Sequence, residues 1–317
     1  MRSLLLASLP SILAMSFAGS AEASDKTVVT LGTATPGGGF PVYGEALALS
    51  VNETDPSLEV RPTNTAGSFE NIPLLEAGTL DIGLVQGEAA LEALNGIGRP
   101  QANLRVIFAM YATPGMFMVR ADSPYHTIDD LKGKPVVFGA KGSGLPILAR
   151  YVLDGLGLDR DRDFEAILLE RAGDGPQLVS AGKAAALWGG GSAWPGFTAL
   201  AKAADGGRFI VPDAEGIRRI RAKHSFLETL TVPAGSFPGQ PTAMVSVGSW
   251  SFILSRPTLP DALAYRLTRA LNQSEARLAA RLPQARETTA ANTVASARRE
   301  LLHPGTLKYL EELGLVR

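Results

Sequence analysis

The chain has 317 residues, of which 45% are hydrophobic, so it can bury a large core and is long enough for two domains. Its 30 Lys and Arg residues nearly balance its 31 Asp and Glu residues, which argues against a nucleic-acid partner because such a partner requires a basic face. The sequence contains no cysteine, which excludes disulfides, thiolate metal sites and cysteine nucleophiles.

The first 23 residues have the composition of a secretory signal peptide. They begin with a positive charge at Arg2, continue through the mostly apolar stretch Leu4–Phe17, and end on Ala21-Glu22-Ala23, which has the A-x-A form of a signal-peptidase site. The apolar stretch is short and is broken by Pro10, which disfavours the alternative of a transmembrane anchor. We therefore expect residues 1–23 to be cleaved and the mature protein to be periplasmic.

From Thr27 onward, short β-branched or apolar runs alternate with segments of helical periodicity. The predicted strands and helices are, in alternation, Val28–Leu31, Val42–Asn52, Leu58–Arg61, Ser68–Ala77, Ile82–Val85 and Ala89–Leu94. This βαβαβ pattern predicts a parallel sheet, in which the loops that face a ligand follow the carboxyl ends of the strands. Those loops are Gly32–Gly39, Thr63–Ser68 and Gln86–Glu88, so their polar residues should converge on one edge.

A second α/β unit follows, and the chain then returns to the first. Two apolar strands are predicted on either side of Pro114, a later strand leads back toward the first unit, and two helices close the chain. The strands on either side of Pro114 are Arg105–Tyr111 and Gly115–Val119. The second unit continues with the strand Val136–Phe138, the helix Pro146–Leu156 and the segments Leu178–Gly182, Ala185–Trp188 and Phe209–Val211. The returning strand is Val245–Leu254, and the closing helices are Leu259–Leu282 and Thr306–Leu313.

Both units contain a glycine-rich loop between a strand and the start of a helix, at Gly37–Gly39 and at Gly142–Gly144. Glycine lets backbone N–H groups approach a ligand closely, and a helix N-terminus adds unpaired donors and partial positive charge. The two loops therefore predict the two sides of one site for a small polar or anionic ligand.

Two α/β lobes with two chain crossings and a shared cleft are typical of periplasmic binding proteins. We place the crossings near Ser123–Thr127 and Pro241–Val245. The predicted domains are lobe 1, residues 24–125 plus 244–317, and lobe 2, residues 126–243. The predicted fold class is therefore α/β, with mostly parallel sheets in two lobes that close about a hinge.

No constellation in the sequence predicts catalysis. His126, His224 and His303 are scattered, and none has the spacing of a metal ligand to another histidine. The segment Gly190–Trp194 fails the last position of the G-x-S-x-G nucleophile elbow. The loop at Gly37–Gly39 matches neither the dinucleotide-binding glycine pattern nor a phosphate-binding loop. We expect no catalytic residue, no metal and no cofactor.

The candidate ligand contacts come from both lobes. They are Thr33, Thr35, Gly38, Gly39, Phe40, Ser68, Asn71, Gln86, Glu88, Gly142, Ser143, Gly144 and Trp188. Several have a structural alternative: Ser68 is also suited to cap its helix, and Glu88 can either bind an ammonium group or cap the next helix as a solvated carboxylate. Trp188 and Trp194 lie near glycines, where an aromatic wall could cover a ligand, but tryptophan is equally common in cores.

Six stretches spread over the mature chain resemble one known family. They are Gly32-Thr33 with Gly37-Gly38, Gly67–Asn71, Leu84–Gln86, Pro233–Gln240, Val247-Gly248, and Leu302–Gly305 with Tyr309. Together, and in this order, they are similar to the TAXI family, the solute receptors of one branch of the TRAP transporters (tripartite, ATP-independent, periplasmic).

The resemblance implies a type II periplasmic-binding-protein fold that captures a small organic acid or amino acid, such as glutamate or 2-oxoglutarate. It also implies delivery of that solute to the TRAP membrane permease subunits, which use a sodium gradient, and we expect a monomer. The alternatives are a sensing subunit that signals to a membrane kinase, and an enzyme built on the same scaffold, which would require clustered histidines or a cofactor lysine.

The sequence departs from the family pattern at three places in the expected cleft. Glu88 stands where an aspartate is usual, after an unusual Gly87, and Ala185 lies where an aspartate is usually close by. The segment Trp188–Trp194 replaces a more ordinary apolar strand and turn. The identity of the ligand is therefore the least transferable part of the resemblance.

Overall fold

The structure is a computed structural model, and it describes residues 26–316. The predicted signal peptide, residues 1–23, lies outside the described residues. The strands are β1 (Thr27–Gly32), β2 (Leu58–Thr63), β3 (Ile82–Val85), β4 (Arg105–Arg120), β5 (Pro135–Ala140), β6 (Glu165–Leu169), β7 (Ala186–Gly190), β8 (Gly207–Ile210), β9 (Glu228–Val232) and β10 (Met244–Ser255). The helices are α1 (Gly39–Thr54), α2 (Ser68–Glu76), α3 (Gly87–Asn95), α4 (Leu145–Leu156), α5 (Arg160–Asp163), α6 (Gly175–Ser180), α7 (Pro195–Ala201), α8 (Ala214–Lys223), α9 (Asp261–Arg281), α10 (Ala290–Ser296) and α11 (Pro304–Glu312).

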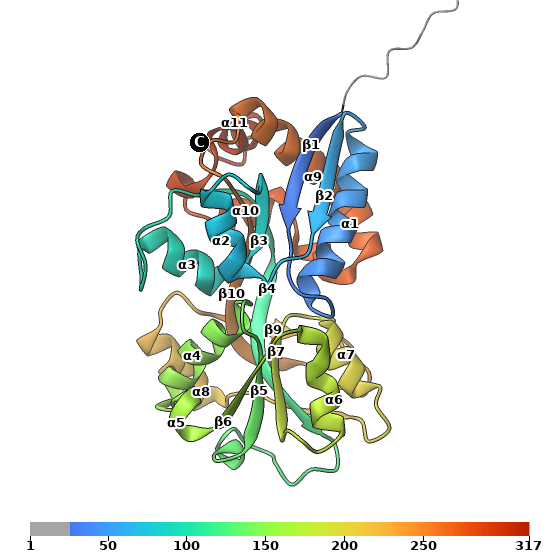
Figure 1. Ribbon diagram of the computed structural model, residues 1–317, viewed down its shortest axis with the longest axis vertical. Coiled ribbons are helices and arrows are strands. Elements are labelled where there is room, and N and C mark those ends of the chain that lie inside the picture. Colours follow the sequence, from blue (N-terminus) through green and yellow to red (C-terminus); the bar gives the residue numbers. More distant parts are fainter. Residues whose placement is uncertain (1–25, 317) are drawn as a thin grey trace, which may run out of the picture.

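The first lobe is built on the predicted βαβαβ unit. Strand β1 pairs in parallel with both β2 and β3, so the three carboxyl ends lie on one edge. Strand β3 is buried at every position, as expected for a strand that is covered on both faces. Figure 1 shows this unit in the upper half of the molecule, together with α9, α10 and α11 from the end of the chain.

The second lobe is a smaller α/β unit with its own core. Strand β5 pairs in parallel with β6 and β7, and β7 and β8 pair antiparallel with β4. Its core centres on Trp188, which is fully buried and packs against Phe117 with ring centroids 4.7 Å apart. Figure 1 shows this lobe in the lower half.

Two long antiparallel strands, β4 and β10, run through both lobes. We expected two strands around Pro114, and this expectation was wrong because β4 is continuous. Proline is tolerated there because β4 changes partners at this point, from β10 to β7, and the Pro114 carbonyl still accepts a hydrogen bond from Gly191 N–H at 3.3 Å.

The same strands carry the change from one hydrophobic core to the other. On β4, Tyr111 belongs to the core of the first lobe and Met116 to that of the second, so the change precedes the predicted crossing at 123–127. On β10, Val247 belongs to the second core and Ile253 to the first, beyond the predicted crossing at 241–245. The residue limits of the two lobes stay predictions. None of the helices in residues 26–316 is both long and apolar enough to cross a membrane.

Candidate functional site

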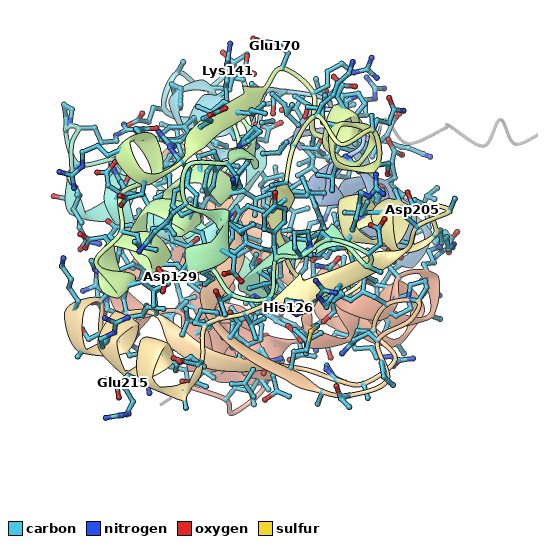
Figure 2. All side chains as sticks on the ribbon, turned by 90° about the horizontal axis from the view of Figure 1, so that it is seen from below. His126, Asp129, Lys141, Glu170, Asp205 and Glu215 are labelled. Carbon is cyan, nitrogen blue, oxygen red and sulfur yellow. The ribbon has the colours of Figure 1, made fainter. Side chains whose placement is uncertain are left out.

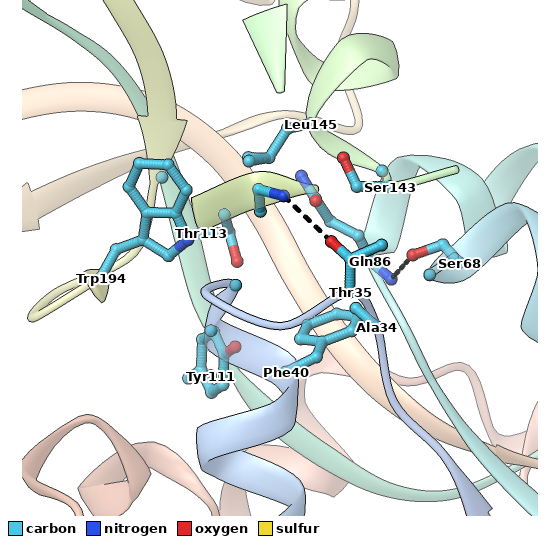
Figure 3. A pocket seen from close by; sticks show the side chains of 16 residues that line it. Ala34, Thr35, Phe40, Ser68, Gln86, Tyr111, Thr113, Ser143, Leu145 and Trp194 are labelled. Atoms are coloured by element: carbon cyan, nitrogen blue, oxygen red, sulfur yellow. Dashed lines mark hydrogen bonds between the residues drawn. The ribbon is translucent and has the colours of Figure 1, made fainter. Parts of the chain in front are cut away.

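A cavity of about 50 Å³ lies between the lobes, where the carboxyl ends of β1, β2 and β3 face the loops after β5 and β7. Among the predicted ligand residues, those that line it are Thr35, Gly38, Gly39, Phe40, Ser68, Gln86, Ser143 and Gly144. The other lining residues were not among the predicted ligand contacts, and they include Tyr111, Thr113, Leu145, Ala172 and Trp194. Figure 3 shows these side chains around the cavity.

Five helices begin at the cavity without a side-chain cap. The N-cap residues of α1, α2, α3, α4 and α7 all line it, and within residues 26–316 none of them makes a capping side-chain bond: Gly38, Gly67, Gln86, Gly144 and Trp194. In contrast, several helices that begin elsewhere are capped by their own side chains: Asp213 for α8, Thr289 for α10 and His303 for α11. The uncapped ends supply N–H donors and partial positive charge at the cavity.

The lobes touch on both sides of this cavity. Phe69 N–H donates to the Gly142 carbonyl at 3.0 Å on one side, and Ala172 N–H donates to Thr35 Oγ1 at 3.1 Å on the other. Gly173 N–H also donates to the Pro36 carbonyl at 3.3 Å. The structure therefore represents a closed arrangement in which the lobes are in contact on both sides of the cavity.

Two side-chain donors of the cavity wall have no partner in the described part of the chain. Tyr111 is only 3% exposed and Trp194 only 5%, yet neither the Tyr111 hydroxyl nor the Trp194 indole N–H is hydrogen-bonded. Both lie near the start of α1, since a Cβ atom placed on Gly39 would be 3.6 Å from the Tyr111 oxygen and 3.8 Å from Trp194 Nε1. Burial raises the pKa of the Tyr111 hydroxyl, so it is a neutral donor at ordinary pH.

The described residues that line the cavity include no Asp, Glu, Lys, Arg or His side chain. The nearby loop lysine, Lys141, does not line it and pairs instead with Glu170 at the edge of the molecule (Figure 2). Positive potential in the cavity therefore comes from backbone and neutral side-chain donors, and not from a cationic side chain.

Ser68 does not cap its helix, so that alternative was wrong. Gly67 is the N-cap residue of α2, and the Ser68 hydroxyl instead accepts a hydrogen bond from Gln86 N–H at 3.1 Å. The hydroxyl thus joins two of the predicted ligand loops at the cavity wall (Figure 3).

Four other predicted ligand residues lie behind the lining. Thr33 Oγ1 donates to the Thr63 carbonyl at 3.0 Å, and the Asn71 amide donates at 2.8 Å to the carbonyls of Thr33 and Leu84. Asn71 therefore ties the end of β1 to β3. Gly142 and Trp188 belong to the second lobe. Gly142 forms part of the lobe contact, and Trp188 Nε1 donates to the Leu145 carbonyl at 3.0 Å from within the core.

Glu88 also lies behind the lining, and it is fully buried, so its interpretation as a solvated carboxylate was wrong. Its Oε1 accepts a hydrogen bond from Ser249 Oγ at 2.8 Å, and its Oε2 accepts one from Gln86 Nε2 at 3.1 Å. Burial without a cationic partner raises the pKa of Glu88 to about 7.

The fold is shared with solved solute-binding proteins. PhnD1 from Prochlorococcus marinus (MIT 9301), solved with methylphosphonate, superposes with a TM-score of 0.53 at 13% identity over 91% of this chain and 97% of that one. The alkanesulfonate-binding protein SsuA from Xanthomonas axonopodis pv. citri, bound to MOPS, gives 0.51 at 19% identity over 90% and 83%. A TctC solute-binding protein from Polaromonas gives 0.50 at 18% identity over 91% and 98%.

These likenesses confirm the predicted α/β periplasmic-binding-protein fold. At such low identities they establish the fold alone, and the sequence itself carries the more specific relationship. The model of the NMT1-like family matches residues 31–314, which is nearly all of the described chain, and the protein therefore belongs to the NMT1-like family.

Proposed function

We propose that the protein is a periplasmic solute receptor that encloses a small anionic solute between its lobes and hands it to a membrane transporter. The observation that carries this proposal is the convergence of five uncapped helix N-termini on one cavity between the lobes. Backbone N–H groups at helix starts bind anions, and they need no cationic side chain to do so.

The cavity favours the small members of the carboxylate and amino-acid class. Its volume of about 50 Å³ has room for only a few water-sized groups. The unpartnered donors at Tyr111 and Trp194 suit the oxygens of one acid group, whereas the described lining residues offer no counter-charge for a second one. A sulfonate or phosphonate would use the same donors, so these acids belong in the same test.

The lining does not support the alternative of catalysis. The hydroxyl of Ser143 donates to the Ala140 carbonyl at 2.9 Å, and that of Ser68 accepts from a backbone N–H. Neither is paired with a histidine or carboxylate among the described residues, as an activated nucleophile would be. This pattern fits a site that holds its ligand and releases it unchanged.

The proposed partner is a TRAP-type permease, because the stretches that resemble the TAXI family run through the whole mature chain. Closure of the lobes would create the surface that the permease recognises. Genes for membrane permease subunits next to the gene for this protein would support transport, and an adjacent membrane kinase would instead support sensing.

The proposal is tested by thermal unfolding in the presence of small carboxylates, amino acids, sulfonates and phosphonates. A ligand at a hundredfold excess over its dissociation constant adds about 2.7 kcal/mol to the free energy of unfolding and raises the melting temperature accordingly. If no acid in the panel raises the melting temperature, the proposed ligand class is wrong.

A further inference from the structure

A buried chain of hydrogen bonds links the cavity wall to one of the strands that connect the lobes. Ser249 lies on β10, Glu88 lies in the first turn of α3, and Gln86 lies at the end of β3 and lines the cavity. The Glu88 carboxylate lies between the other two, 2.8 Å from Ser249 Oγ and 3.1 Å from Gln86 Nε2. All three residues are less than 10% exposed.

This chain fixes which end of the Gln86 amide is available to a ligand. A carboxylate can only accept hydrogen bonds, so it holds the amide nitrogen and leaves Gln86 Oε1 without a donor in the described structure. The oxygen points to the opposite lobe, because a Cβ atom placed on Gly144 would be 2.8 Å from it. Gln86 therefore presents a group that can only accept, beside the unpartnered Trp194 N–H and Tyr111 hydroxyl of the same cavity (Figure 3).

We propose that Glu88 is a positioning residue: in its ionised form it holds the Gln86 amide oxygen toward the cavity and so selects anions that also carry a hydrogen-bond donor. Small 2-hydroxy acids and 2-amino acids have this combination of groups. A protonated Glu88 can donate a hydrogen bond, so it no longer enforces this amide orientation and the selection weakens. This inference rests on the proposed function, since it concerns the selectivity of the same cavity.

The surroundings of Glu88 allow its charge to change near neutral pH. Within α3 the nearest charged group is Glu92, which itself binds Arg150 and the Tyr151 hydroxyl of α4. The packed segment of β10 presents Ser249 and the Trp250 carbonyl, neither of which titrates. Burial and the negative charge of Glu92 both disfavour the ionised form, and they raise the pKa of Glu88 to about 7.

The link between the two side chains can be measured without a ligand. In ¹⁵N-labelled protein, the side-chain amide signals of Gln86, assigned by their loss in Gln86→Met, should shift with pH with a midpoint near neutrality. The isosteric Glu88→Gln variant should show no such titration, while Ser249→Ala, which keeps the carboxylate, should retain one. If the wild-type amide signals are constant between pH 5 and 9, the inference is wrong.

The selectivity is measured with two acids of nearly equal size, 2-hydroxypropanoate and propanoate, by calorimetry at pH 6.0 and pH 8.5. At pH 8.5 the hydroxy acid should bind about tenfold more tightly, as expected for one added hydrogen bond, and this ratio should fall at least threefold at pH 6.0. In Glu88→Gln the ratio should be the same at both pH values.

The outcomes separate the two proposals. Binding of both acids with a wild-type ratio that does not depend on pH would overturn the role of Glu88 and leave the proposed function intact. If neither acid binds, nor any other acid of the panel, the proposed function fails, whereas the amide titration still decides whether Glu88 controls Gln86.

Discussion

Replacing Gly142 by alanine should weaken ligand binding because it holds the lobes apart. The added Cβ atom would lie 2.5 Å from Ala66 Cβ and 2.7 Å from the Ala66 carbonyl oxygen, on the other lobe. Carbon atoms in contact normally stay about 3.5 to 4.0 Å apart, so the two loops must separate by about 1 Å. Neither partner can rotate away, because one is a backbone atom and the other is bonded directly to the backbone.

The magnitude follows from the contacts that this separation breaks. The bond from Phe69 N–H to the Gly142 carbonyl, now 3.0 Å, would lengthen beyond the useful range of hydrogen bonds. Its loss costs about 1 kcal/mol, and the remaining overlap costs about as much again. Together these terms weaken binding by about 2 kcal/mol, which corresponds to roughly a 30-fold higher dissociation constant.

The assay is calorimetric titration with the acid that gives the largest thermal shift in the panel. A matched control is Gly173→Ala, at the other lobe contact, where the new Cβ atom would be 3.4 Å from Gly37 Cα and from the Pro36 carbonyl and therefore fits. We expect the control to bind within about twofold of wild type. Unchanged binding by Gly142→Ala, or equal weakening by both variants, would refute the reasoning.

Three further predictions separate binding from stability. Tyr111→Phe should weaken binding about tenfold without lowering the free energy of unfolding, because the Tyr111 hydroxyl lines the cavity and bonds to no described residue. The control Tyr43→Phe loses a 3.0 Å bond to Thr288, so it should lower the free energy of unfolding by about 1 kcal/mol and leave binding unchanged. The reverse pattern in titrations and urea unfolding would contradict the assignment of Tyr111 to the cavity. Trp188→Ala should lower the free energy of unfolding by about 3 to 5 kcal/mol, since the ring is fully buried; a loss below about 1 kcal/mol would exclude it from the core. Burial raises the pKa of Glu88 to about 7, so the folded protein holds this proton more tightly than the unfolded chain does. The stability that this proton contributes is fully present below the pKa of Glu88 in the unfolded chain. As pH rises through 7 it is lost, and the free energy of unfolding falls by about 3 kcal/mol in total. Urea unfolding from pH 4 to 8.5 should show this decline in wild type and a smaller one in Glu88→Gln; identical profiles would place the titration elsewhere.

Much of the first lobe was predictable because its signals are local. The apolar runs and helical periodicity predicted β1, α1, β2, α2, β3 and α3 in order, and β3 matched at both ends. The rule that parallel strands share one carboxyl edge then brought Thr35, Ser68 and Gln86 to one cavity. Strands β6 and β9, which are only partly buried, were missed.

Other features depend on contacts between distant segments. Tyr111 lies within an apolar strand, and nothing in its local sequence indicates that its hydroxyl opens into the cavity. Trp188 and Trp194 lie in similar glycine-rich surroundings, but one points into the core from β7 and the other lies at the start of α7. The burial of Glu88 depends on Ser249, which is 161 residues away in the chain.

The central claim is that the closed cleft holds a small acid through uncapped helix ends. Native mass spectrometry of the protein purified from its source tests this most directly, since it identifies whatever the cleft carries. We expect one bound small acid per chain, released on unfolding with an unchanged mass. A chain that carries no acid and gains no stability from any acid of the panel, or one that converts its bound acid, would contradict it.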